Sequence, residues 1–270
     1  MKRLTTFILG LGLLAGLTGQ IQAAPIAFSV DTNSDRFVRI DLGTGTTTFI
    51  GSGIGFDDVE GLAFQPGTGI LFGLDDSSDQ LITVNTTTGV GTVVGTLGSN
   101  FSEAGLGFDS SGTLFASSDL GDNGVYTVNP LTGFATFLSS TGPDPFALAF
   151  DGTTLFGTSD DCTGSDCLVT VNRTTGVSTE VGPLGISIDQ GGLDFDSNGT
   201  LWFFDAGAPS VYTINKNTGT ATAGSTISCD PDCRLEPLAI KAAPVPEPST
   251  MILLGTGLAG IIAWRRKTAA

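Results

Sequence analysis

The amino-acid sequence predicts an all-β protein, a five-bladed β-propeller that residues 25–242 build from four-stranded repeats of about 43 residues. Three observations predict this fold. Thr-Gly pairs recur at steps of 43 or 44 residues, apolar phrases return at matching places between them, and 39 glycines with 18 phenylalanines suit short strands joined by tight turns. The Thr-Gly pairs begin at Thr44, Thr88, Thr132, Thr175 and Thr218.

Three apolar phrases mark the strands of each repeat. Each phrase alternates apolar with small or polar residues, the period of a half-buried strand, and ends in a Gly, Asn or Asp turn. Phrases of the Gly-Leu-Ala-Phe type begin at Gly61, Gly105, Ala147 and Gly192; Leu-Phe or Leu-Trp pairs begin at Leu71, Leu114, Leu155 and Leu201; and phrases of the Ile-Thr-Val-Asn type end at Asn85, Asn129, Asn172 and Asn215. Four short strands in a period of this length are typical of a propeller blade.

The repeat resembles those of NHL and SMP-30-like propellers, in which the Gly-Leu-Ala-Phe strand lies innermost. With that strand order four blades are complete in the sequence, and the fifth must be shared between the two ends of the domain. Residues 237–240 are expected to supply its inner strand, and residues 26–51 its outer three. Such a shared blade closes the ring and leaves no free sheet edge around it.

The N-terminal segment, residues 1–24, has the order of a secretory signal peptide. Lys2 and Arg3 precede an apolar stretch at about residues 7–17, and small residues end the segment at Ala23 and Ala24. We therefore expect an exported protein.

The C-terminal segment, residues 243–270, has three parts in order. A Pro-rich motif at 245–249, containing Pro246, Glu247 and Pro248, precedes an apolar helix at 250–264 and a basic tail at 265–267. The apolar part is short for a full membrane span of about 20 residues. The basic tail would hold its end on the cytoplasmic side of the membrane.

This segment resembles the PEP-CTERM sorting signal of exosortase substrates. The resemblance implies an exosortase-type processing enzyme as a partner and a Gram-negative, exopolysaccharide-producing host. It also implies a membrane-anchored precursor that is released near the motif to the cell surface or extracellular matrix. An anchor that is never cleaved is the alternative.

Composition excludes several classes of function. The chain has 27 Asp and Glu against 11 Lys and Arg, which argues against a nucleic-acid partner, and it has no histidine for Ser-His or Cys-His catalysis or the usual zinc sites. Two close cysteine couples, Cys162 with Cys167 and Cys229 with Cys233, predict two disulfides in an exported protein. A zinc site built from all four cysteines is the alternative.

The acidic residues are expected on one face of the propeller. With the strand order above, most of them fall in loops before the inner strand or between the second and third strands, and these loops share a face. Five of them precede an inner strand closely and should ring the mouth of the central channel, where propeller loops converge on ligands. They are Glu60, Glu103, Asp144, Asp189 and Glu236. A solvated acidic rim around a water-filled channel is the alternative.

Calcium is the cofactor that such an acidic face suggests, because this hard cation takes six to eight oxygen ligands. Two loops have alternating oxygen-bearing residues: Asp31, Asn33 and Asp35 in one, and Asp75, Ser77 and Asp79 in the other. Neither loop is an EF-hand, because neither has the required Gly or the closing Glu. Ordinary turn capping by aspartate explains the same residues without a metal.

The sequence favours a non-enzymatic surface or matrix module that binds a polymer such as exopolysaccharide, a cation or another surface protein. It contains no pair of nucleophile and base, and its blades are alike, so we name no catalytic residues. One alternative is a hydrolase or lyase that uses carboxylates, with or without a metal, at the acidic channel mouth. A structural spacer in the biofilm matrix is the other.

Overall fold

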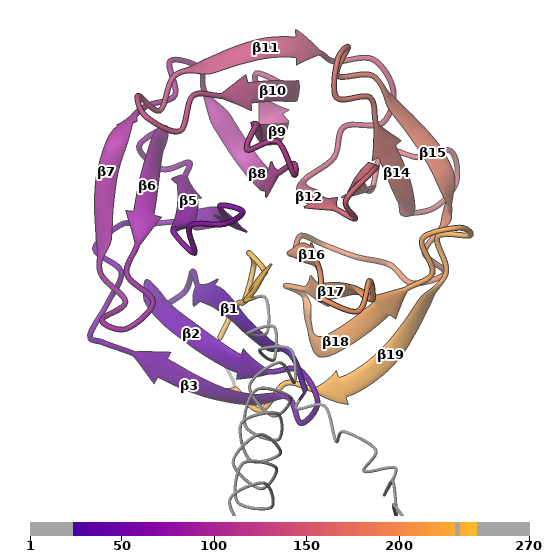
Figure 1. Ribbon diagram of the computed structural model, residues 1–270. Helices are drawn as coiled ribbons and strands as arrows, with labels where there is room; N and C mark the ends of the chain where they lie inside the picture. Colours follow the sequence, from indigo (N-terminus) through magenta and orange to yellow (C-terminus); the bar gives the residue numbers. More distant parts are fainter. Residues whose placement is uncertain (1–23, 230–232, 242–270) are drawn as a thin grey trace, which may run out of the picture.

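The computed structural model describes residues 24–229 and 233–241 and shows five four-stranded antiparallel sheets around a central axis (Figure 1). The predicted all-β fold, with five blades of four strands each, is confirmed. The predicted signal peptide, except for Ala24, and the predicted sorting segment lie outside the described residues. Within the described ranges, no helix is both long enough and apolar enough to span a bilayer.

Each blade runs outward from an inner strand at the axis. Blade one is β4 (Val59–Phe64), β5 (Leu71–Asp75), β6 (Gln80–Val84) and β7 (Gly91–Thr96). Blade two is β8 (Phe101–Phe108), β9 (Leu114–Gly121), β10 (Gly124–Val128) and β11 (Ala135–Ser139). Blade three is β12 (Ala147–Phe150), β13 (Leu155–Ser159), β14 (Cys167–Val171) and β15 (Ser178–Pro183). Blade four is β16 (Leu193–Phe195), β17 (Leu201–Asp205), β18 (Ala208–Ile214) and β19 (Ala221–Thr226).

Blade five is shared between the ends of the domain, as the repeat predicts. Its strands, from the axis outward, are β20 (Ala239–Ile240), β1 (Ile26–Asp31), β2 (Arg36–Asp41) and β3 (Thr46–Ile50). Strand β20 pairs antiparallel with β1 and is shorter than predicted; Pro237, which has no backbone N–H to donate, lies just before it. All twenty strands lie within residues 25–242 and the ring closes on itself, so this part is expected to fold alone.

The recurring Thr-Gly pairs mark the places where one blade touches the next. Each of these glycines has a positive φ and closes the turn before an outer strand. A Cβ on each of them would lie 2.0–2.6 Å from an atom of the neighbouring blade's outer strand, closer than any side chain tolerates. The contacts are Gly45 with Thr226, Gly89 with Ile50, Gly133 with Gly95, Gly176 with Leu138, and Gly219 with Gly182. The repeat is therefore a record of blade-to-blade packing.

The hydrophobic core lies between the blades. Each cluster of buried apolar side chains joins two neighbouring blades, as where Phe28 and Phe37 of blade five pack with Leu62 and Leu71 of blade one. The two predicted disulfides are present. Cys162–Cys167 closes the loop between β13 and β14, and Cys229–Cys233 lies between β19 and β20.

Candidate functional site at the two ends of the central axis

The middle of the central axis is nearly filled. The five inner strands surround the axis (Figure 1), and a void of about 10 Å³ is lined by one buried leucine from each blade. These leucines are Leu62, Leu106, Leu148, Leu193 and Leu238. A volume of that size holds about one water molecule. The two ends of the axis are therefore separate candidate sites.

Three of the five predicted channel-mouth acids meet at one end. Glu60, Glu103 and Glu236 line a second void of about 10 Å³, together with Phe146 and Gln190. We call this group the acidic mouth. Only 4% of Glu236 is exposed, and its Oε2 has no hydrogen-bond partner within the described residues. Burial raises the pKa of Glu236 to about 7, although the guanidinium of Arg234 opposes the shift.

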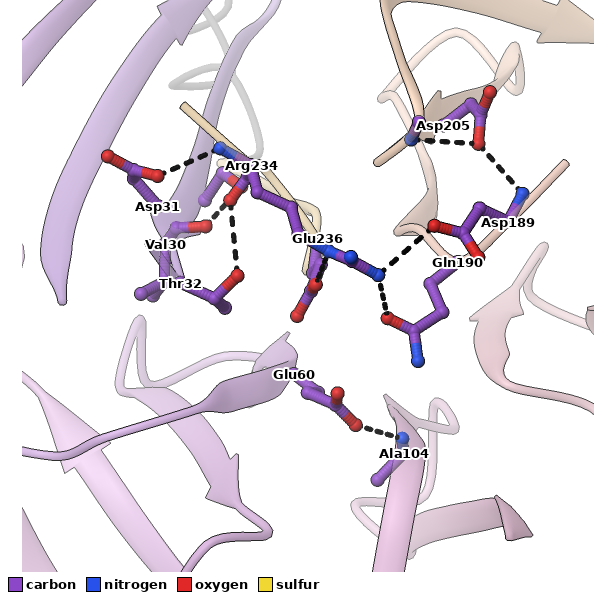
Figure 2. Close-up of polar contacts among 12 residues, drawn as sticks. Val30, Asp31, Thr32, Glu60, Ala104, Asp189, Gln190, Asp205, Arg234 and Glu236 are labelled. Carbon is purple, nitrogen blue, oxygen red and sulfur yellow. Dashed lines mark hydrogen bonds and ion pairs between the residues drawn. The ribbon is translucent and has the colours of Figure 1, made fainter. Parts of the chain in front are cut away.

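Glu60 joins blade one to blade two and shares a proton with its neighbour. Its carboxylate accepts a hydrogen bond from the backbone N–H of Ala104 at 2.7 Å (Figure 2). Burial raises the pKa of Glu60 and also that of Asp76, and a hydrogen bond between the two carboxyls raises the pKa of Glu60 further while it lowers that of Asp76. Glu60 therefore carries the proton of this pair at neutral pH.

Arg234 contacts the acidic mouth and is not among the residues predicted there from the sequence. Its guanidinium contacts Glu236 through Nε, and through Nη2 it reaches Gln190 Oε1 at 2.6 Å and Asp189 Oδ2 at 3.2 Å (Figure 2). Its backbone N–H donates to Asp31 Oδ1 at 2.9 Å. Arg234 thus fixes the returning C-terminal segment and neutralises part of the acidic charge. Arg234 could have been noticed in the sequence because basic residues are rare: it is one of only six Lys and Arg in residues 25–242.

Asp189 and Asp144, the other two predicted acids, lie away from the void. The Asp189 side chain is 60% exposed and is paired with Arg234, while its backbone N–H donates to Asp205 Oδ1 at 3.0 Å. Asp144 instead joins Asp119 and Asp161.

Two groups of three carboxylates meet on the acidic face. In each group one oxygen per residue lies within 4.8 Å of the other two, and the groups are Asp58 with Glu60 and Asp76, and Asp119 with Asp144 and Asp161. Asp119 is 8% exposed, and its pKa rises to about 7 because of burial and then the nearby carboxylates Asp160, Glu103, Asp161 and Asp144. Sequence reasoning placed these acids on one face but did not bring the trios together.

The two loops predicted to bind calcium have a local structural role. Asp31 and Asp75 each accept a hydrogen bond from the serine hydroxyl three residues on, Ser34 and Ser78, as in an aspartate-capped turn. Asp79 Oδ1 accepts the backbone N–H of Phe101 in the next blade at 2.8 Å. Asn33 and Asp35 lie in the first turn and Ser77 in the second. Calcium at these loops remains a prediction. None of the six predicted ligands belongs to a carboxylate trio, although Asp76, which lies within the second loop, does.

The opposite end of the axis holds a cavity of about 480 Å³. The last residue of every inner strand lines it: Phe64, Phe108, Phe150, Phe195 and Ile240. Asp194 and Lys241 also contribute to the wall. This cavity was not predicted from the sequence. The sequence feature that corresponds to it is the fourth residue of each Gly-Leu-Ala-Phe phrase, a phenylalanine in four of the five blades, which lies at one level of the axis.

The fold and the sorting segment define the class: a five-bladed β-propeller with a C-terminal sorting signal. The chain matches a solved structure described as the crystal structure of a nidogen/laminin complex, with 17% identity over 80% of each chain and a TM-score of 0.55. At this identity the likeness supports the fold alone. No curated protein matches the chain.

Residues 244–267 match the PEP-CTERM protein-sorting motif. The match confirms the predicted sorting signal. It implies processing by an exosortase and an exported, sorted surface protein of a Gram-negative bacterium.

Proposed function

We propose that this protein is a surface binding module without catalytic activity, whose acidic face holds calcium. The sorting motif supports its place at the cell surface. The observation that carries the cation proposal is the meeting of three carboxylates at each of two points on one face.

The group of Asp119, Asp144 and Asp161 is the better of the two calcium sites. Burial and then four nearby carboxylates raise the pKa of Asp119, and no base is among these main causes. A cation that displaces the proton from Asp119 would relieve this repulsion. Three carboxylates supply about half of the six to eight oxygens that calcium takes, and backbone carbonyls and water can supply the rest.

Bound calcium would also explain how so acidic a face meets a partner. Uncompensated, the face repels acidic exopolysaccharide and acidic surface proteins. A cation held by three carboxylates retains open coordination positions, through which it can bridge to the carboxylates of such a polymer or protein. We therefore propose exopolysaccharide or another surface protein as the partner, bound through calcium.

An enzymatic role is the second candidate, and Glu60 is the observation that favours it. A protonated carboxyl beside a carboxylate is the arrangement that glycosidases use for general acid–base chemistry. The void beside Glu60 is about 10 Å³, however, which leaves no room for a sugar unit. Release of reducing ends from polysaccharide by the wild-type protein, abolished in Glu60→Gln, would favour the enzyme over the binding module.

Thermal unfolding of residues 25–242 with calcium, and then with excess chelator, tests the cation site. At a concentration one hundred times its dissociation constant, one calcium ion adds about 2.7 kcal/mol of stability. For a domain of this size we expect a rise in Tm of about 5 to 10 °C, reversed by chelator.

Asp144→Asn should abolish that rise. Asp57→Asn is the matched control, because Asp57 is an exposed acid on the same face, outside both trios. An unchanged Tm at millimolar calcium, or an equal loss of the rise in both variants, would contradict the site.

A further inference from the structure

The cavity opposite the acidic mouth has the size and wall of a small-molecule site. Its volume of about 480 Å³ lies within the range of about 300 to 1,000 Å³ typical of ligand pockets. Three leucines and four phenylalanines of the inner strands contribute to the wall, and the polar side chains that line it are Gln65, Asp109, Ser110, Asp194 and Lys241. The nearly filled middle of the axis closes its inner end. A ligand would therefore enter from the face opposite the acids.

Asp194 is a polar departure from the repeat in this wall. The matching positions of the other inner strands carry Ala63, Gly107, Ala149 and Ala239, none of which has a polar side chain. Asp194 Oδ2 accepts the backbone N–H of Ile240 at 2.6 Å, and Oδ1 accepts that of Phe195 at 2.8 Å. The carboxylate thus ties blade four to β20, yet it also lines the cavity, where its remaining lone pairs can accept a ligand.

Within the described residues Asp194 has no cationic partner. Two cations near the cavity are paired with other acids, Arg173 with Asp109 at 2.8 Å and Lys216 with Asp151 at 2.6 Å, while Lys241 lines the wall itself. The nearest charged group of the same blade is Asp196, on the turn that follows β16. Neighbouring elements contribute Lys241 after β20 and two ion pairs, Asp109–Arg173 and Asp151–Lys216. Burial, and then the charge of Asp196, raise the pKa of Asp194 to about 7.

The aromatic rings of the wall attract cations. The Arg173 guanidinium lies 5.0 Å from the Phe150 ring centroid, and Lys216 Nζ lies 5.8 Å from that of Phe195. Aromatic rings around a carboxylate are a recurrent means of recognising ammonium groups, because the ring faces and the carboxylate both carry negative potential.

We propose that this cavity binds a small organic cation, whose ammonium group faces Asp194 and whose aliphatic substituents contact the ring of phenylalanines. The ammonium supplies the missing charge for this partly buried carboxylate. Its alkyl groups fill the apolar wall, which a hydrated metal ion cannot do. Lys241, which lines the same wall, is an internal group that could compete for this position.

Calorimetric titration of residues 25–242 with choline, and separately with its neutral carbon isostere 3,3-dimethylbutan-1-ol, tests the inference. Chelator in the buffer keeps divalent cations off the acidic face, so the result is independent of the calcium proposal. At pH 8 we expect choline to bind at least tenfold more tightly than the alcohol. Because Asp194 ionises with a pKa of about 7, choline affinity should rise about tenfold from pH 6 to pH 8.

Variants separate the two parts of the site. Asp194→Asn should remove the preference for choline over the alcohol, and Phe64→Leu should weaken choline more than the alcohol. Phe137→Leu is the matched control, since Phe137 is 52% exposed on outer strand β11, far from the axis. Lys241→Met removes the internal competitor. Equal affinities for the two probes, or no choline binding to either the wild type or Lys241→Met, would overturn the inference.

Discussion

Replacing Gly133 with alanine should destabilise the ring at a blade junction. Gly133 has a φ of +82°, and a Cβ there would lie 2.5 Å from the carbonyl oxygen of Gly95 in blade one. The left-handed backbone costs a non-glycine residue about 1 to 2 kcal/mol, and overpacking against a neighbour adds about 1 to 3 kcal/mol. We therefore expect Gly133→Ala to lower the free energy of unfolding by about 2 to 5 kcal/mol.

Gly112→Ala is the matched control for this substitution. Gly112 has a similar φ of +86°, but no atom lies within 4 Å of the position its Cβ would take. This variant should lose only the backbone contribution, about 1 to 2 kcal/mol. Calorimetric unfolding of residues 25–242 measures both, and the Tm of Gly133→Ala should fall by about 5 to 20 °C. Equal losses in the two variants would refute the view that the Thr-Gly repeat records close blade contacts.

Two further predictions concern carboxyls with raised pKa values, and both are checked by urea unfolding between pH 4 and pH 8. Arg234→Met should lower the free energy of unfolding by about 1 to 3 kcal/mol at pH 8 and by less at pH 5. The reason is that the pKa of Glu236 is about 7, and the protonated carboxyl needs no cation. An equal loss at both pH values would contradict this. The folded wild type binds the Asp194 proton more tightly than the unfolded chain does, so it should lose up to about 4 kcal/mol of stability between pH 4 and pH 8 through this group. Asp194→Asn should reduce this loss. An unchanged slope of stability against pH in the variant would count against burial of that charge.

The fold could be predicted from the sequence because every propeller blade imposes the same structural requirements, which appear as a sequence repeat. Each blade needs a glycine of positive φ where it meets its neighbour, and an apolar inner strand whose side chains pack on both sides. Gly133 and the phrase at 105–108 are examples of these two constraints. The closure by 237–240 followed from counting strands, and the two disulfides from cysteine spacing within an exported chain.

The candidate sites could be predicted only in part, because they depend on how loops converge. Asp31 and Asp75 have calcium-like spacing, but a serine three residues on makes each of them a turn cap. Asp144 was expected at the channel mouth with Glu60, yet Glu60 lies within inner strand β4, whereas Asp144 precedes β12 and meets Asp119 and Asp161. The local sequence does not predict which neighbours these side chains contact, because packing between blades determines it.

Calorimetric titration of calcium into residues 25–242 at pH 7, in two buffers of different ionisation enthalpy, tests the cation site most directly. Because Asp119 has a pKa of about 7, calcium binding should release about half a proton from it, so the measured heat should differ between the buffers. Asp144→Asn should abolish this binding and Asp57→Asn should retain it. Absence of binding at millimolar calcium, or binding without proton release that Asp144→Asn leaves intact, would contradict a calcium site on the acidic face.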